Sequence, residues 1–111
     1  MATTLQQAVD ESYAVAREKG WWDSPTSVPE KLALIHSEVS EVLEEFRNNK
    51  AMPDVYYGLN GKPEGIPVEL ADILIRVFDI CGRYRIDIEN AYQLKTTYNR
   101  SREYRHGGKR A

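Results

Sequence analysis

The chain has 111 residues and a formal net charge of −2, which suits a single domain with one modest core and gives no global sign of nucleic-acid binding. Its hydrophobic fraction of 41% is that of an ordinary soluble protein, and no apolar run approaches the roughly 20 residues that span a membrane. The single cysteine, Cys81, excludes an internal disulfide framework and a cysteine-rich zinc site. Because no secretory signal is visible, a cytoplasmic location is the default expectation.

Apolar residues at helical spacing predict two helices in the first half of the chain. The first runs from about Thr4 to Lys19, and Gly20 ends it as a C-terminal glycine does. The second runs from about Pro29 to Asn48, with Ser27 placed to cap its N-terminus and a proline in its first turn.

Two further helices are predicted in the second half of the chain. Residues 49–66 contain two prolines and three glycines and no sustained alternation, so they are predicted to form a loop without regular structure. The third helix, from about Pro67 to Tyr84, is apolar nearly all round and should be the central, most buried one. The fourth runs from about Ile88 to Arg105, with Asp87 as its N-cap.

The expected fold is all-α, a four-helix bundle-like arrangement in one domain that spans residues 1–111. A bundle this small, with one helix that is apolar nearly all round, does not cover its own core. We therefore expect the chain to oligomerise, most simply as a symmetric dimer.

Four carboxylates have the spacing of one shared site. Glu38 and Glu41 lie three residues apart in the second helix, and Glu69 and Asp72 lie three apart in the third, so each pair shares one helix face. Antiparallel packing would bring the pairs together, and carboxylates held so close cannot all be ionised unless cations neutralise them. All-oxygen ligation favours Mg²⁺, or Mn²⁺, over zinc. The simpler alternatives are a solvated acidic face and a salt bridge from Asp72 to Arg76.

Charge is unevenly distributed along the chain. Residues 30–72 contain nine acidic and four basic residues, whereas residues 95–111 contain six basic residues and one acidic residue. In the fourth helix Lys95, Asn99 and Arg102 lie on one face, where their side chains suit phosphate oxygens. The alternatives are that the two segments attract each other and that the bases only favour a helix C-terminus.

With these motifs the chain resembles, over essentially its whole length, the MazG-like all-α nucleoside triphosphate pyrophosphohydrolases. The resemblance rests on the paired E-x-x-E and E-x-x-D motifs, on "EKGWWD" and "LIHSEVSE", and on "K-x-x-Y-N-x-x-R" followed by "HGGKR". Members of that family use Mg²⁺ to hydrolyse nucleoside triphosphates between the α and β phosphates, and they form dimers or dimers of dimers with sites near subunit interfaces. The resemblance implies metal ligands at Glu38, Glu41, Glu69 and Asp72. It implies phosphate contacts at Lys95, Asn99 and Arg102.

One position departs from the family pattern. Several members have a glutamate directly before the first motif glutamate, where this chain has Ser37. Glu38 or Glu41 then activates the attacking water, a metal-bound hydroxide suffices, or turnover is slow. Glu45, four residues beyond Glu41, is a further candidate ligand or water-orienting base, whereas Glu44 points elsewhere. Two alternatives to an enzyme stay open: a helical binding module with an acidic face, and an inactive relative that binds nucleotide without hydrolysis.

Selection of the base is the least determined part of the prediction. Trp22 and Tyr98 are the favoured substrate contacts, and Trp21 is expected to pack under the first helix. The segment 52–65 is long enough to act as a lid. Other residues with a possible contact to nucleotide are Tyr13, His36, Tyr56, Tyr57, His106, Lys109 and Arg110.

Overall fold

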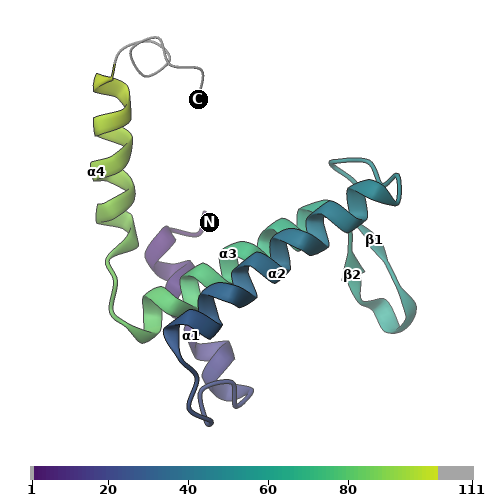
Figure 1. The fold of residues 1–111 in the computed structure, drawn as a ribbon, viewed down its shortest axis with the longest axis horizontal. Coiled ribbons are helices and arrows are strands. Elements are labelled where there is room, and N and C mark those ends of the chain that lie inside the picture. The colour runs from purple at the N-terminus through teal and green to yellow at the C-terminus, as the bar shows by residue number, and fades with distance from the viewer. Residues whose placement is uncertain (1, 103–111) are drawn as a thin grey trace.

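The computed structural model describes residues 2–102 and confirms an all-α fold (Figure 1). Its helices, in chain order, are α1 (Leu5–Glu18), α2 (Val28–Arg47), α3 (Ile66–Arg83) and α4 (Ile88–Ser101). Within the described residues, no helix is long and apolar enough to cross a membrane.

Three helix ends follow the signals read from the sequence, at Gly20, Ser27 and Asp87, and Thr4 adds a cap that was not predicted. At the start of α1, Thr4 and Gln7 form a reciprocal capping box, and Ser27 and Asp87 cap α2 and α4 with their side-chain oxygens. Gly20, at φ +81°, ends α1, because the N–H of the next residue reaches back to the carbonyl of Ala16. Because these bonds lie within a few residues of the helix ends that they cap, the sequence alone predicts these ends.

The fourth helix ends earlier than predicted. Arg102 has extended backbone angles, φ −76° and ψ 152°, so α4 stops at Ser101 and the predicted continuation through Arg102 is wrong. The hydroxyl of Ser101 donates to the carbonyl oxygen of Tyr98 at 2.6 Å, which takes up an acceptor at the helix end. Residues 103–105 lie outside the described part of the chain.

The segment between α2 and α3 is not a structureless loop. It contains two short antiparallel strands, β1 (Tyr56–Tyr57) and β2 (Pro63–Glu64), joined by the 3₁₀ turn η1 (Leu59–Gly61). Strands of two residues are too short to show alternation, so no pattern in the sequence predicts them. Gly65, at φ +119°, then leads into α3, and a side chain there would collide with the carbonyl oxygen of Asp54.

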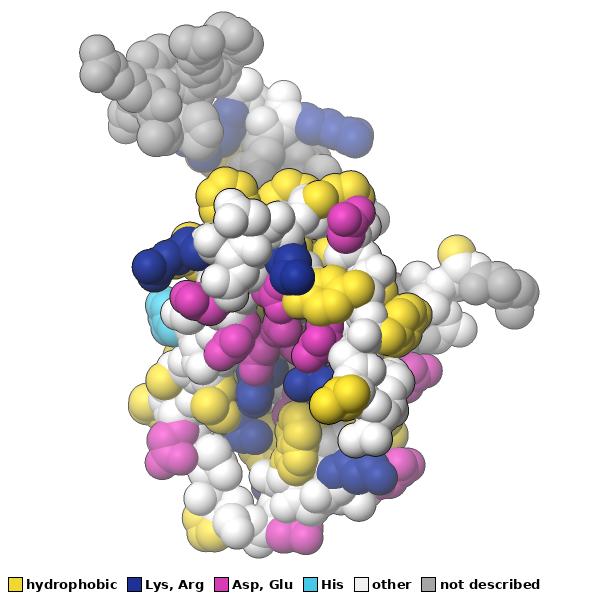
Figure 2. Space-filling model, turned by 90° about the vertical axis from the view of Figure 1, so that its right-hand side faces the viewer, with side chains coloured by type: hydrophobic (Ala, Val, Ile, Leu, Met, Phe, Trp, Pro, Cys, Tyr) yellow, Lys and Arg dark blue, Asp and Glu magenta, His cyan; other side chains and the backbone are white. Residues whose placement is uncertain are grey.

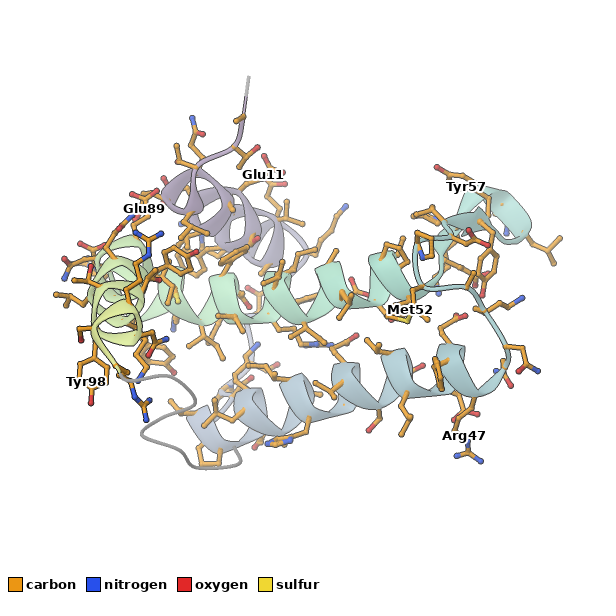
Figure 3. All side chains as sticks on the ribbon, turned by 90° about the horizontal axis from the view of Figure 1, so that it is seen from above. Glu11, Arg47, Met52, Tyr57, Glu89 and Tyr98 are labelled. Carbon is orange, nitrogen blue, oxygen red and sulfur yellow. The ribbon has the colours of Figure 1, made fainter. Side chains whose placement is uncertain are left out.

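Helix α3 lies at the centre of the fold, as predicted. It runs antiparallel to α2 along most of its length, and its other side packs against α1 (Figures 1 and 3). Gly82 allows α1 and α3 to approach closely, since a Cβ there would lie 2.5 Å from the Cβ of Tyr13. Helix α4 instead turns away and has its main contact with α1, where the N–H of Gln6 donates to Glu89 at 3.0 Å.

One chain therefore forms three packed helices with a fourth that stands apart, rather than a four-helix bundle. The turn is made by Arg85, whose φ of 55° ends α3 and redirects the chain. The core of the described residues is small: its buried apolar members are Val9, Ala16, Ile66 and Cys81. Helices α2 and α3 keep large apolar side chains exposed, including Leu43, Phe46, Leu70 and Leu74.

Candidate metal centre

Three of the four predicted carboxylates meet between α2 and α3. Glu38 comes from α2, and Glu69 and Asp72 come from adjacent turns of α3. One carboxylate oxygen from each lies within 4.8 Å of the other two, and all three side chains are half-buried. Figure 2 shows acidic side chains gathered in the middle of this face of the molecule. We call Glu38, Glu69 and Asp72 the carboxylate triad.

Electrostatics within the triad disfavours three negative charges. Burial is the main cause that raises the pKa of Glu69, followed by the charges of Asp72, Glu38 and Glu41. Burial and then the charge of Glu38 raise the pKa of Asp72, although a hydrogen bond to Glu69 and the charges of Arg76 and Lys62 act in the opposite direction. The triad is therefore short of positive charge.

Glu41 does not belong to the triad. Its side chain is exposed, yet its charge is close enough to raise the pKa of Glu69. Glu41 thus lies at the rim of the cluster rather than at its centre. The two carboxylates of α3 are three residues apart and both enter the triad, whereas only one of the equivalent pair on α2 does so.

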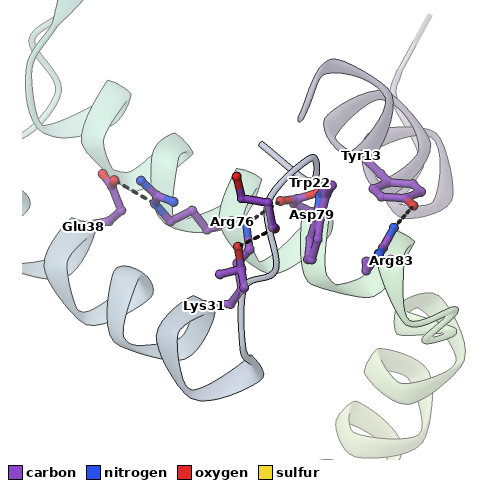
Figure 4. A network of polar contacts seen from close by, with 9 residues as sticks. Tyr13, Trp22, Lys31, Glu38, Arg76, Asp79 and Arg83 are labelled. Carbon is purple, nitrogen blue, oxygen red and sulfur yellow. Dashed lines mark hydrogen bonds and ion pairs between the residues drawn. The ribbon is translucent and has the colours of Figure 1, made fainter. Parts of the chain in front are cut away.

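Arg76 pairs with Glu38 rather than with Asp72. Its Nε atom donates to Oε1 of Glu38 at 2.9 Å (Figure 4), so the salt bridge to Asp72 considered from the sequence is not the one formed. The residue lies four positions after Asp72, on the same face of α3. That spacing was visible in the sequence, but the partner on α2 was not.

Glu45 is bound by the hairpin. The hydroxyl of Tyr56 lies 2.9 and 2.8 Å from the two carboxylate oxygens of Glu45 and donates to them. This hydrogen bond is the largest of the causes that raise the pKa of Tyr56 to about 12. Glu44, as expected, is exposed, with Arg47 at 3.8 Å. Tyr56 therefore anchors the β1–β2 hairpin to the C-terminal half of α2, and Tyr57 points to solvent, 69% exposed.

The structural tryptophan is Trp22, so the expectation that Trp21 fills this role is wrong. The indole N–H of Trp22 donates to Oδ1 of Asp79 at 2.8 Å (Figure 4), and Lys31 lies 4.0 Å from the ring centroid. Asp79 is only 4% exposed, so the indole satisfies a buried acceptor. Trp21 is 49% exposed. A contact of Trp22 with substrate stays a prediction.

The aromatic rings of Tyr13 and Tyr84 lie edge-on to Trp22, each at a centroid distance of 6.3 Å. Tyr13 also accepts a hydrogen bond from Arg83 at 3.3 Å. It is thus part of the packing between α1 and α3. His36 is exposed on α2, and its carbonyl oxygen accepts a hydrogen bond from Ser40.

The predicted phosphate-binding residues lie away from the triad within one chain. Lys95, Asn99 and Arg102 are all exposed on α4 or directly after it. Tyr98 is 56% exposed, with Lys95 at 5.2 Å and Arg102 at 5.6 Å from its ring centroid. Figure 3 shows Tyr98 and the hairpin residue Tyr57 at opposite ends of the molecule. His106, Lys109 and Arg110 lie outside the described residues.

Comparison of the chain with protein-family models, with curated proteins and with solved structures found no match. The chemistry of the carboxylate triad fits a hard divalent cation: the donors are carboxylate oxygens only, they come from two helices, and they lie close enough to share one ion.

Proposed function

We propose that this protein is an Mg²⁺-dependent nucleotide pyrophosphohydrolase. It would cleave ribo- or deoxyribonucleoside triphosphates between the α and β phosphates, giving the monophosphate and pyrophosphate, in the house-cleaning of nucleotide pools. The observation that supports this proposal is the convergence of Glu38, Glu69 and Asp72 across the α2–α3 interface. An acidic surface that only docks a basic partner has no need to bury carboxylates against one another at a cost in stability.

We assign roles to the residues from their positions. Glu38, Glu69 and Asp72 would hold Mg²⁺, or Mn²⁺ in its place. The ion would neutralise phosphate oxygens and lower the pKa of a water molecule. Glu41 is exposed at the rim of the triad, where its carboxylate is free of packing and can accept a proton from the attacking water. Water oxygen bonds to the α phosphorus, the bond to the bridging oxygen breaks, and pyrophosphate leaves with that electron pair.

A second copy of the chain would complete the site. In one chain Lys95, Asn99 and Arg102 are exposed, and α4, on which or directly after which they lie, has its main contact with α1 rather than with α2 or α3. The large apolar side chains exposed on α2 and α3 need cover, for example Leu43 at 56% and Phe46 at 60% exposed. We therefore propose a homodimer or homotetramer, in which α4 of one subunit supplies the phosphate contacts to the triad of its neighbour.

Turnover with each common nucleoside triphosphate tests the function directly. Purified protein with Mg²⁺ or Mn²⁺ is expected to give monophosphate and pyrophosphate without diphosphate, as separated by ion-exchange chromatography. The double substitution E69Q and D72N should abolish turnover while leaving the helical circular dichroism spectrum unchanged. E44Q is the control, because Glu44 is a carboxylate of the neighbouring helix α2 that is exposed and lies outside the triad. Diphosphate as a product, or equal turnover by the double variant, would refute the mechanism.

The absence of any product would favour an inactive relative, because Ser37 stands where a further acid is expected. The variant S37E would then distinguish an enzyme that lacks only its activating carboxylate from a protein that only binds. Restored turnover would mean that only the activating carboxylate is missing. Continued inactivity would leave nucleotide binding, or docking of a basic partner, as the function.

A further inference from the structure

Arg76 is a cation placed directly at the carboxylate triad. Its ion pair with Glu38 is partly buried, with the two side chains 25% and 15% exposed. The contact uses Nε and only one oxygen of Glu38, Oε1, at 2.9 Å. Its positive charge also lowers the pKa of Asp72, as does that of Lys62. Arg76 therefore offsets part of the repulsion among the triad carboxylates.

Asp79, the next acidic residue of α3, already has other partners than Arg76. Asp79 already accepts the indole N–H of Trp22 at 2.8 Å and has Lys31 at 4.0 Å. The described residues that face the guanidinium thus offer Glu38 as its one ion-pair partner. A partly buried arginine that neutralises a cluster of candidate metal ligands occupies the electrostatic role that a metal ion would take.

Space for a second position of Arg76 lies beside it. A hollow of about 150 Å³ between α1 and α3 is lined by Trp21, Ile75, Asp79 and Arg76 itself. The guanidinium carbon already lies 5.8 Å from the ring centroid of Trp21. If the guanidinium of Arg76 leaves Glu38, it can therefore stack on the exposed indole of Trp21 and approach the carboxylate of Asp79. Its charge then does not remain unpaired.

We propose that Arg76 is a built-in counter-ion of the triad, which a divalent cation displaces from Glu38 as it binds. The inference rests on the proposed metal site and goes beyond it. In the metal-free protein Arg76 stabilises the packed α2–α3 interface. The incoming ion must compete with it, so the ion pair lowers the affinity of the site for metal.

Calorimetric titration of the metal-free protein with Mg²⁺, and with Mn²⁺ as a tighter probe, tests the competition. The variant R76Q is expected to bind the metal about tenfold more tightly, because one positive charge beside a divalent ion is removed from a partly exposed site. Its melting temperature without metal should fall, and the rise on adding Mg²⁺ should exceed that of the wild type. R76K retains the charge and should remain closer to the wild-type affinity.

The matched control is R47Q. Arg47 also lies within reach of a glutamate of α2, at 3.8 Å, but both side chains are largely exposed and lie outside the triad. Its metal affinity should equal that of the wild type. A direct readout on the wild-type protein is the ¹⁵N resonance of the Arg76 Nε–H group, assigned by its loss in R76K. Addition of Mg²⁺ should shift this resonance and accelerate exchange of its proton with water.

Two results would overturn the inference alone. The first is metal binding by R76Q that is no tighter than that of the wild type: weaker binding would mean that Arg76 orients Glu38 as a ligand, and equal binding that the ion pair is only structural. The second is an unchanged Nε–H resonance, which would also mean that the ion pair is only structural. If neither the wild type nor R76Q binds metal, the proposed metal site fails and the inference fails with it. The resonance measurement decides the matter even if R76Q does not fold.

Discussion

The substitution D72N should stabilise the metal-free protein while it weakens the response to metal. In the triad, carboxylate oxygens of Asp72, Glu38 and Glu69 lie within 4.8 Å of one another. Two negative charges at about 5 Å repel by roughly 1 kcal/mol in water and by roughly 3 kcal/mol at an effective dielectric constant near 20. Because the site is half-exposed, the lower value applies to each pair.

An asparagine at position 72 removes the repulsion from Glu38 and Glu69, and its amide can donate a hydrogen bond to either carboxylate. The substitution also removes the attraction between Asp72 and the charges of Arg76 and Lys62. In the wild type these two charges partly offset the causes that raise the pKa of Asp72. The net gain should be about 1 kcal/mol in the free energy of unfolding, or about 4 °C in melting temperature for a domain of this size.

Thermal melting followed by circular dichroism at pH 7, with a chelator and then with Mg²⁺, measures both effects. The wild type should melt at a higher temperature with Mg²⁺, since an ion bound only by the folded state stabilises it. D72N should gain less from Mg²⁺. The control E44Q should differ from the wild type by less than about 0.5 kcal/mol, because an exposed ion pair contributes little. A lower melting temperature of D72N in chelator would refute the repulsion argument and make Asp72 a structural residue.

The same repulsion sets the sign of the pH dependence without metal. The pKa values of Glu69 and Asp72 are raised above their ordinary values of 4.5 and 3.8. As the pH falls from neutrality toward these raised values, the folded state takes up protons before the unfolded chain does. These two groups therefore make the protein more stable as the pH falls through that window, and the gain levels off below the ordinary pKa values. The stability of D72N should rise less than that of the wild type as the pH falls, and thermal melting over this pH range measures the difference.

Three further substitutions test interactions outside the triad. Y56F removes the hydroxyl that binds Glu45 and should cost about 1 kcal/mol in urea unfolding, with faster hydrogen exchange in the hairpin. D79N leaves the ammonium of Lys31, whose side chain is 8% exposed, without its counter-charge, and should lower the free energy of unfolding by about 3 kcal/mol. G82A places a methyl group against α1, and thermal melting should show a loss of about 2 kcal/mol.

Helix positions and the carboxylate pairs could be predicted because their signals are local. A cap such as Ser27 acts on an N–H three residues away, and the E-x-x-D spacing alone puts Glu69 and Asp72 on one face of α3. Local signals could not predict which of the two tryptophans, Trp21 or Trp22, packs in the interior. Adjacent residues in the irregular turn after Gly20 point in different directions, and only the buried acceptor Asp79, more than fifty residues later, selects Trp22.

The direction in which α4 leaves α3 could not be predicted from the sequence either. The link from α3 to α4 turns on Arg85 at φ 55°, a conformation for which glycine or asparagine is the usual signal. Nothing in "RYRID" indicates it. The hairpin strands Tyr56–Tyr57 and Pro63–Glu64 were missed because they are defined by pairing with each other rather than by a pattern within either one.

The position of α4 bears on the uneven charge of the chain. An attraction between the acidic and basic segments would place α4 against α2 or α3. Among residues 2–102, however, no ion pair joins α4 to either helix, and Lys95 and Arg102 flank Tyr98 instead. Attraction within the described part of one chain therefore does not account for the basic face of α4 that Lys95 and Arg102 form. In the homo-oligomer that we propose, an anionic ligand held between a basic α4 and the triad of a second subunit would account for both halves of the asymmetry. The subunit contact would also cover the apolar surface that one chain leaves exposed on α2 and α3.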